Sequence, residues 1–280
     1  MAKYLIINAD DFGLNKEQNE AIKDLLNKKL ITSTSLMSVA PEAPNAANFA
    51  KEISFPVGVH ITLNSDDEKE LYPSLTGVAS LGKVGLWNKS KSLTFKAKRK
   101  DVRAELEAQY RYIIDKGASV DHADSHCGTV YGINGRRFYL DAFDFCKAHK
   151  LPFRFPKTVG FLERQIGVKI PSPIVKLQQL IVASAEKRDV KLLTDLVSNP
   201  WSMGKIKDYE TLRKYYLDAV DSCLDGVTEI FLHPALQNEI YGKEWKKREL
   251  EYQLLKSGDL LQRAEENGIE VVGWNVFDFL

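Results

Sequence analysis

Short apolar runs alternate with longer stretches of helical period along most of the chain. The short runs are typical of buried strands, and the stretches between them repeat apolar residues every three or four positions, as on one helix face. This alternation predicts parallel β/α units, in which a covering helix follows each strand. The expected strands are residues 4–8, 36–39, 57–61, 120–123, 153–155, 229–233 and 271–274, and the expected helices are residues 16–29, 97–116, 174–197, 207–222 and 244–267.

Two stretches break this rhythm. Residues 65–96 are rich in glycine and scattered aromatics and are too long for a plain connection, so we expect a lid loop over a site. Residues 156–206 combine Pro171 and Pro173 with the helical segment 174–197, and we expect an insertion there. Neither stretch differs enough in composition to form a separate domain. We therefore expect residues 1–280 to form one domain.

Composition excludes several classes of function. The 39 basic and 38 acidic residues leave a formal net charge of +1, which gives no general attraction to nucleic acid or to a membrane surface. No apolar run reaches 18 residues, so no membrane span is expected. Three scattered cysteines, Cys127, Cys146 and Cys223, do not make a disulfide framework. We expect a cytoplasmic globular protein.

Polar groups gather where the expected strands end. Asp10 and Asp11 end the first strand, His60 lies in the third, "DHADSH" ends the fourth, and His233 ends the sixth. In parallel β/α folds the carboxyl ends of the strands form the active site. Each group also has a plainer interpretation, because a strand-end histidine is often structural and Asp11 could cap a helix. Four of the five histidines share this placement, which favours a common site.

Aspartate and histidine at one edge are suitable ligands for a divalent ion such as Mg²⁺ or Zn²⁺. A bound cation would also explain the adjacent aspartates, because it offsets the repulsion between them and keeps both ionised. One carboxylate would then hold the ion while the other accepts a proton. Strand alternation alone does not say which aspartate faces the ion.

Five motifs occur in one order along the chain: "LIINADDFGLN", "VGVHITLN", "HADSH", "FRFP" and "IFLHPA". Together they resemble the YdjC-type carbohydrate deacetylases, which include chitooligosaccharide deacetylases. The resemblance implies an incomplete, roughly seven-stranded (β/α) barrel of the glycoside hydrolase/deacetylase type. It also implies an enzyme that removes acetyl groups from N-acetylated sugars with one divalent metal ion, Mg²⁺ or Zn²⁺.

The resemblance also implies roles for single residues. The metal ligands would be Asp11, His60 and His126, with Asp10 as the catalytic base. His233 would protonate the leaving amine, and Arg154 would support the base or the substrate. The weaker substrate-binding candidates are Trp87, Asp124 and Cys127.

One motif departs from the family pattern. Family members often read DSHxHxH, whereas this chain reads "DSHCGTVYG", with Cys127, Gly128 and Thr129 after the ligand histidine. Substrate contacts near the metal should therefore differ. For Asp124 we favour the interpretation that it orients a ligand histidine or caps a helix, whereas Trp87 can equally cover local core.

Two other functions are compatible with the same residues: a metal-dependent phosphoesterase on a similar barrel, or a non-catalytic sugar-binding protein. The expected partner is an acetylated sugar, and we allow for a homodimer.

Overall fold

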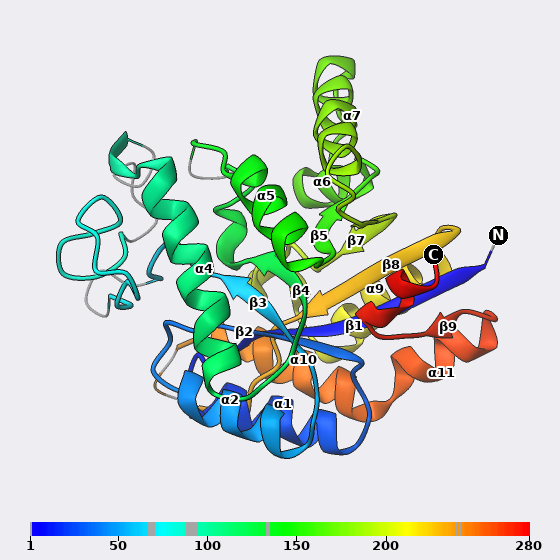
Figure 1. Cartoon of the computed structure of the whole chain (residues 1–280). Helices are drawn as coiled ribbons and strands as arrows, with labels where there is room; N and C mark the ends of the chain where they lie inside the picture. The colour runs from blue at the N-terminus through cyan, green and yellow to red at the C-terminus, as the bar shows by residue number, and fades with distance from the viewer. Residues whose placement is uncertain (1, 67–70, 88–94, 133–134, 239, 241) are drawn as a thin grey trace.

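A computed structural model describes residues 2–66, 71–87, 95–132, 135–238, 240 and 242–280 (Figure 1). Its described strands form one nine-stranded parallel sheet, in the order β6-β5-β4-β3-β2-β1-β8-β7, with β9 paired to β1. The strands are β1 (Lys3–Phe12), β2 (Ser33–Leu36), β3 (Val57–Ile61), β4 (Val120–Ser125), β5 (Phe153–Pro156), β6 (Leu192–Leu193), β7 (Asp195–Val197), β8 (Gly226–Leu232) and β9 (Glu270–Val271).

The two ends of this sheet meet at Thr194, the single residue between β6 and β7. The Thr158 amide donates to the Thr194 carbonyl at 3.3 Å, and the Thr194 amide donates to the Val227 carbonyl at 2.7 Å. Residues 192–197 thus act as one bent strand that contacts β5 on one side and β8 on the other. If β6 and β7 are counted as one bent strand and β9, which lies off the main path beside β1, is left out, seven strands curl around one axis. This confirms the expected incomplete, roughly seven-stranded (β/α) barrel.

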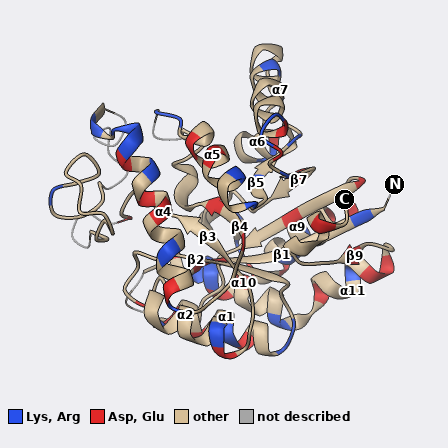
Figure 2. Ribbon diagram, viewed as in Figure 1, with Lys and Arg blue, Asp and Glu red and all other residues tan. Residues whose placement is uncertain are grey.

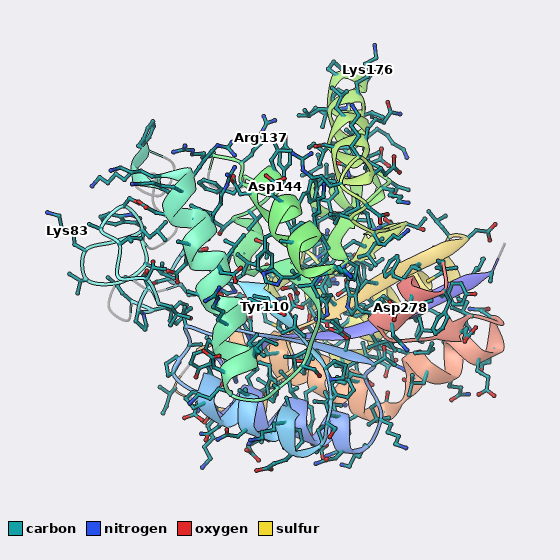
Figure 3. The ribbon with its side chains drawn as sticks, viewed as in Figure 1. Lys83, Tyr110, Arg137, Asp144, Lys176 and Asp278 are labelled. Atoms are coloured by element: carbon teal, nitrogen blue, oxygen red, sulfur yellow. The ribbon has the colours of Figure 1, made fainter. Side chains whose placement is uncertain are left out.

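Helices surround the curled sheet, and α7 extends away from it at the top of the view (Figure 1). Figure 2 shows residues of both charge signs interspersed along these outer helices, and Figure 3 shows the Lys176 side chain near the outer end of α7. The helices are α1 (Lys16–Asn27), α2 (Ala43–Glu52), α4 (Arg99–Asp115), α5 (Tyr139–His149), α6 (Gly160–Ile166), α7 (Ser172–Glu186), α8 (Met203–Ile206), α9 (Tyr209–Asp221), α10 (Trp245–Ser257) and α11 (Asp259–Glu266), with short 3₁₀ turns η1 (His126–Gly128) and η3 (Trp274–Asp278).

The two faces of β1 have different environments. Leu5, Ile7 and Ala9 belong to the large core cluster shared with the helices, whereas Ile6 belongs to a small second cluster that contains Trp274. Because side chains alternate along a strand, Ile6, Asn8 and Asp10 share the other face. One end of the barrel interior is therefore apolar, and the end next to the strand termini is polar.

Several expected boundaries were wrong. The second strand is Ser33–Leu36 and not 36–39. The helix expected over 174–197 ends at Glu186, because residues 192–197 pair with the sheet, so part of the expected insertion belongs to the barrel. The helix expected over 244–267 breaks at Gly258, whose φ of 78° ends α10. The last strand stops at Val271, and a 3₁₀ turn begins at Trp274.

Among the described helices, none combines the length and apolar character that crossing a bilayer requires.

Candidate metal centre and active site

A pocket of about 940 Å³ opens at the carboxyl ends of the strands. It is lined by side chains from β1, β3, β5, the turn after β4 and the segment after β8. Seven of the residues expected from the sequence meet there: Asp10, Asp11, His60, His126, Cys127, Arg154 and His233.

A bend in β1 brings both aspartates to this pocket. Neighbours on a regular strand point to opposite sides. Asp11, however, has a φ of 64°, and the register between β1 and β2 shifts between Ala9 and Phe12. Aspartate adopts this left-handed conformation more readily than most residues. As a result, the side chains of Asp10 and Asp11 both reach the pocket, although Asp10 is only 2% and Asp11 only 1% exposed.

Three atoms form a compact triangle in the pocket. Asp11 Oδ1 lies 3.1 Å from His60 Nε2 and 3.2 Å from His126 Nδ1, and the two ring nitrogens are 3.3 Å apart. Ligands about 2.1 Å from a Mg²⁺ or Zn²⁺ ion lie about 3.0 Å apart in an octahedral site and about 3.4 Å apart in a tetrahedral one. The observed separations fall in this range, so the three residues fit a divalent ion.

Each of the two histidines has a carboxylate on its other ring nitrogen. His60 Nδ1 lies 2.7 Å from Asp124 Oδ1, and His126 Nε2 lies 2.9 Å from Asp66 Oδ1. The Tyr72 hydroxyl donates to Asp66 Oδ2 at 2.8 Å. Such carboxylate partners fix the ring orientation and make the ligand nitrogen more basic.

The surrounding charges favour a cation in the triangle. Burial opposes charge on the His60 ring, but Asp124, followed by a hydrogen bond to Asp11, raises its pKa to about 10. Burial likewise opposes charge on His126, but Cys127, Asp11 and Asp66 raise its pKa. Burial also opposes the Asp11 carboxylate, yet Arg248 and the two histidines lower its pKa. In the absence of an ion, protons on the two rings would supply the positive charge that the carboxylates attract.

Asp10 is held outside the triangle by Arg154. The guanidinium donates to both carboxylate oxygens at 2.8 Å, and Asn8 Nδ2 donates to Asp10 Oδ1 at 2.7 Å. The same guanidinium forms ion pairs with Asp124 Oδ2 at 2.8 Å and Glu229 Oε1 at 2.6 Å. A single buried cation therefore serves three buried carboxylates.

His233 lies on the open side of Asp10. Its Nε2 is 3.8 Å from Asp10 Oδ2, and its backbone amide donates to Glu251 Oε2 at 2.7 Å. The side chain is 31% exposed to the pocket, and its partial removal from water lowers the pKa of the imidazole. His233 can therefore exchange a proton with a molecule in the pocket.

The weaker candidates differ in placement. Cys127 lines the pocket. Asp124 is fully buried behind it and contacts His60 and Arg154. Trp87 is absent from the lining, and its indole nitrogen donates to the Ser80 carbonyl at 3.1 Å.

Sequence reasoning missed three charged residues at the site, namely Asp66, Glu229 and Arg248. Arg248 Nη1 donates to Asp11 Oδ2 at 2.9 Å, and Arg248 lies on α10, in a helical stretch that the sequence pattern gave only a packing role. Glu229 could have been found from strand period, because a charged residue two positions before Phe231 and four before His233 shares their face. Asp66 lies in the long segment 65–96, where no periodic pattern marks it.

Comparison with known proteins matches this chain to one family and to relatives that are named deacetylases. A family model described as YdjC-like protein matches residues 4–266. A carbohydrate deacetylase of Thermoanaerobacter pseudethanolicus is 26% identical over 283 residues, which cover 98% of this chain and 99% of the relative. A chitooligosaccharide deacetylase of Citrobacter koseri is 34% identical over 206 residues, covering 69% of this chain and 80% of the relative.

The fold is also shared with a solved structure from Enterococcus faecalis V583, named for cellobiose-phosphate cleavage. That structure is 24% identical, covers 99% of both chains and has a TM-score of 0.77. At this identity the likeness supports the fold alone.

Proposed function

Because the chain belongs to the YdjC-like family, we propose that it is a metal-dependent carbohydrate deacetylase that hydrolyses the acetamide of N-acetylated sugars or oligosaccharides. Its relatives named carbohydrate and chitooligosaccharide deacetylases support this reaction class. The observation that carries the proposal is the triangle of Asp11, His60 and His126 beside the Asp10–Arg154 pair. A ligand set, a base and a proton donor then share one pocket.

Asp11, His60 and His126 would hold the divalent ion, which when bound would act as a Lewis acid on the acetamide carbonyl and the attacking water. Asp10 accepts the proton of that water, since its carboxylate lies beside the triangle without belonging to it. Arg154 fixes the orientation of Asp10 through two parallel hydrogen bonds. Asp124 acts through both His60 and Arg154 and does not touch the substrate.

His233 donates a proton to the amine nitrogen as the C–N bond breaks, because its Nε2 faces Asp10 from the open side of the pocket. Aromatic side chains line the same cavity and can contact the apolar faces of a sugar ring: Tyr72, Tyr131, Phe161, Phe231 and Trp245. Cys127 contacts the substrate from the turn after His126, where this chain departs from the family's DSHxHxH pattern.

The proposal is tested by acetate release from N-acetylglucosamine and its oligomers. We expect release in the presence of Mg²⁺, Zn²⁺, Co²⁺ or Mn²⁺, its loss after chelation, and its recovery when the ion is restored. Binding of these sugars without acetate release under any of the four ions would contradict the proposal and favour a non-catalytic sugar-binding protein.

A phosphoesterase on this barrel is less well supported. A phosphate would need cationic groups in the site, and of those that line the pocket Arg154 is committed to three carboxylates and Arg248 to Asp11 and Gln18, which leaves Lys16 and Lys247. We expect no phosphate release from sugar phosphates under conditions that release acetate.

A further inference from the structure

A second group of metal-type side chains shares one residue with the first. Asp66 Oδ1 lies 2.9 Å from His126 Nε2, and Cys127 Sγ lies 3.4 Å from both of these atoms. His126 presents Nδ1 to the first triangle and Nε2 to this one. We propose that Asp66, His126 and Cys127 form a second ion site, selective for soft divalent ions such as Zn²⁺, whose occupation inhibits the enzyme.

The geometry of this second triangle fits an ion. The donors come from two separate segments, the start of the loop at 65–96 and the turn after β4, and converge without help from an ion. All three residues line the pocket, and Cys127 is exposed, so an ion can enter from solvent. The remaining coordination positions would face the pocket and be open to water.

The backbone of Cys127 contributes to this convergence. Its φ of 50° is left-handed, a conformation that is unfavourable for a residue with a side chain. It interrupts the 3₁₀ turn His126–Gly128 and leaves the thiol beside the ring of its own predecessor. Strained residues of this kind persist where the surrounding structure requires them, often at functional sites.

The donor set predicts which ion binds. The first triangle offers one carboxylate and two imidazoles, which accept Mg²⁺, Mn²⁺ or Zn²⁺. The second has a thiol in place of one imidazole, and thiolate strongly favours Zn²⁺ and similar soft ions over Mg²⁺. Excess Zn²⁺ should therefore fill this site, and Mg²⁺ should not.

Inhibition follows from position. An ion on Nε2 would replace the hydrogen bond by which Asp66 orients His126, and it would occupy the pocket where the substrate has to lie. Only this inhibition rests on the proposed function, since binding at the second triangle does not depend on the reaction.

Cobalt(II) titration tests the binding, because Co²⁺ substitutes for Zn²⁺ and thiolate ligation gives a near-ultraviolet sulfur-to-cobalt charge-transfer band. In the full-length protein we expect the first equivalent to bind without this band and the second to produce it. C127S should lose the band and weaken the second step by at least about tenfold, the scale of perturbing a metal site. Cys146 and Cys223 remain in this variant and serve as internal controls.

A D11N variant separates the two sites. It should lose the first binding step and still give the sulfur band, whether or not the protein is a deacetylase. In the wild type, turnover with excess Zn²⁺ should be at least about tenfold lower than turnover with one equivalent. In C127S the ratio of these two turnover values should stay near one. Absence of the band beyond one equivalent in the wild type, or its persistence in C127S, would overturn the proposal.

Discussion

The adjacent aspartates of β1 have different neighbours in the structure. Asp11 turns out of the strand alternation at a φ of 64° and meets two imidazoles, whereas Asp10 keeps the inward face and meets Arg154. Their electrostatic repulsion is offset by Arg248 and the two imidazoles beside Asp11 and by the Arg154 guanidinium beside Asp10. Strand periodicity could place both residues at the pocket but could not say which one faces the histidines, because that depends on one backbone torsion; only the family resemblance assigned them separate roles.

At the same scale, Arg154 should matter for stability as well as for activity. R154M leaves Asp10, Asp124 and Glu229 buried without their cation, and removing one partner from such a network costs about 3–5 kcal/mol. R263M is the matched control, because Arg263 pairs with Asp221 at the surface, where water screens the pair, so its loss should destabilise the protein much less. Urea denaturation measures both, and equal losses would contradict the network.

We predict that Glu229 makes the free energy of unfolding depend on pH. Burial raises its pKa to about 7 against an ordinary value of 4.5, so the folded protein holds this proton more tightly than the unfolded chain. Its contribution to stability is therefore present below pH 4.5 and is lost as the pH rises toward 7. Relative to E229Q, the wild type should lose up to about 1.4 kcal/mol per pH unit in this window. A constant difference between the two proteins would contradict the assignment.

At the scale of elements, the structure departs from the sequence pattern where a tertiary contact or a single torsion overrides periodicity. In the sequence pattern, residues 192–197 continue the helical period of 174–197. In the structure, however, their backbone pairs with β5 and β8 and joins the two ends of the sheet. The apolar repeat of 244–267 is also continuous, yet Gly258 divides it into α10 and α11. The first of these helices carries Arg248 to the pocket and places Glu251 behind it, against the His233 backbone amide.

The break at Gly258 should resist any side chain. An added Cβ would meet only Leu30 Cδ2 at 3.9 Å, so the cost of G258A lies in its φ of 78° and not in a clash. We expect a loss of about 1–2 kcal/mol. G204A is the control, because Gly204 lies in α8 without positive φ and should be neutral or slightly stabilising. Thermal unfolding compares the two, and an unchanged melting temperature for G258A would contradict this account.

For the whole molecule, the alternation of apolar runs and helical periods predicted parallel β/α units, because that pattern reflects burial on both faces of each strand. The expectation of a barrel came from the family resemblance. The alternation also placed the histidines at one edge, since the carboxyl ends of parallel strands come together. What it could not provide were the contacts between distant segments. Asp66 lies opposite His126 and Arg248 opposite Asp11 only after the chain has closed on itself.

The central claim is that the two aspartates divide the work, with Asp11 on the ion and Asp10 on the proton. It is tested most directly by measuring Mn²⁺ binding by calorimetry and acetate release from N-acetylated sugars in D10N and D11N. We expect D10N to bind Mn²⁺ as the wild type does while turnover falls by about 10²-fold or more, and D11N to lose both. Wild-type turnover in D10N, or undiminished Mn²⁺ binding in D11N, would contradict the division.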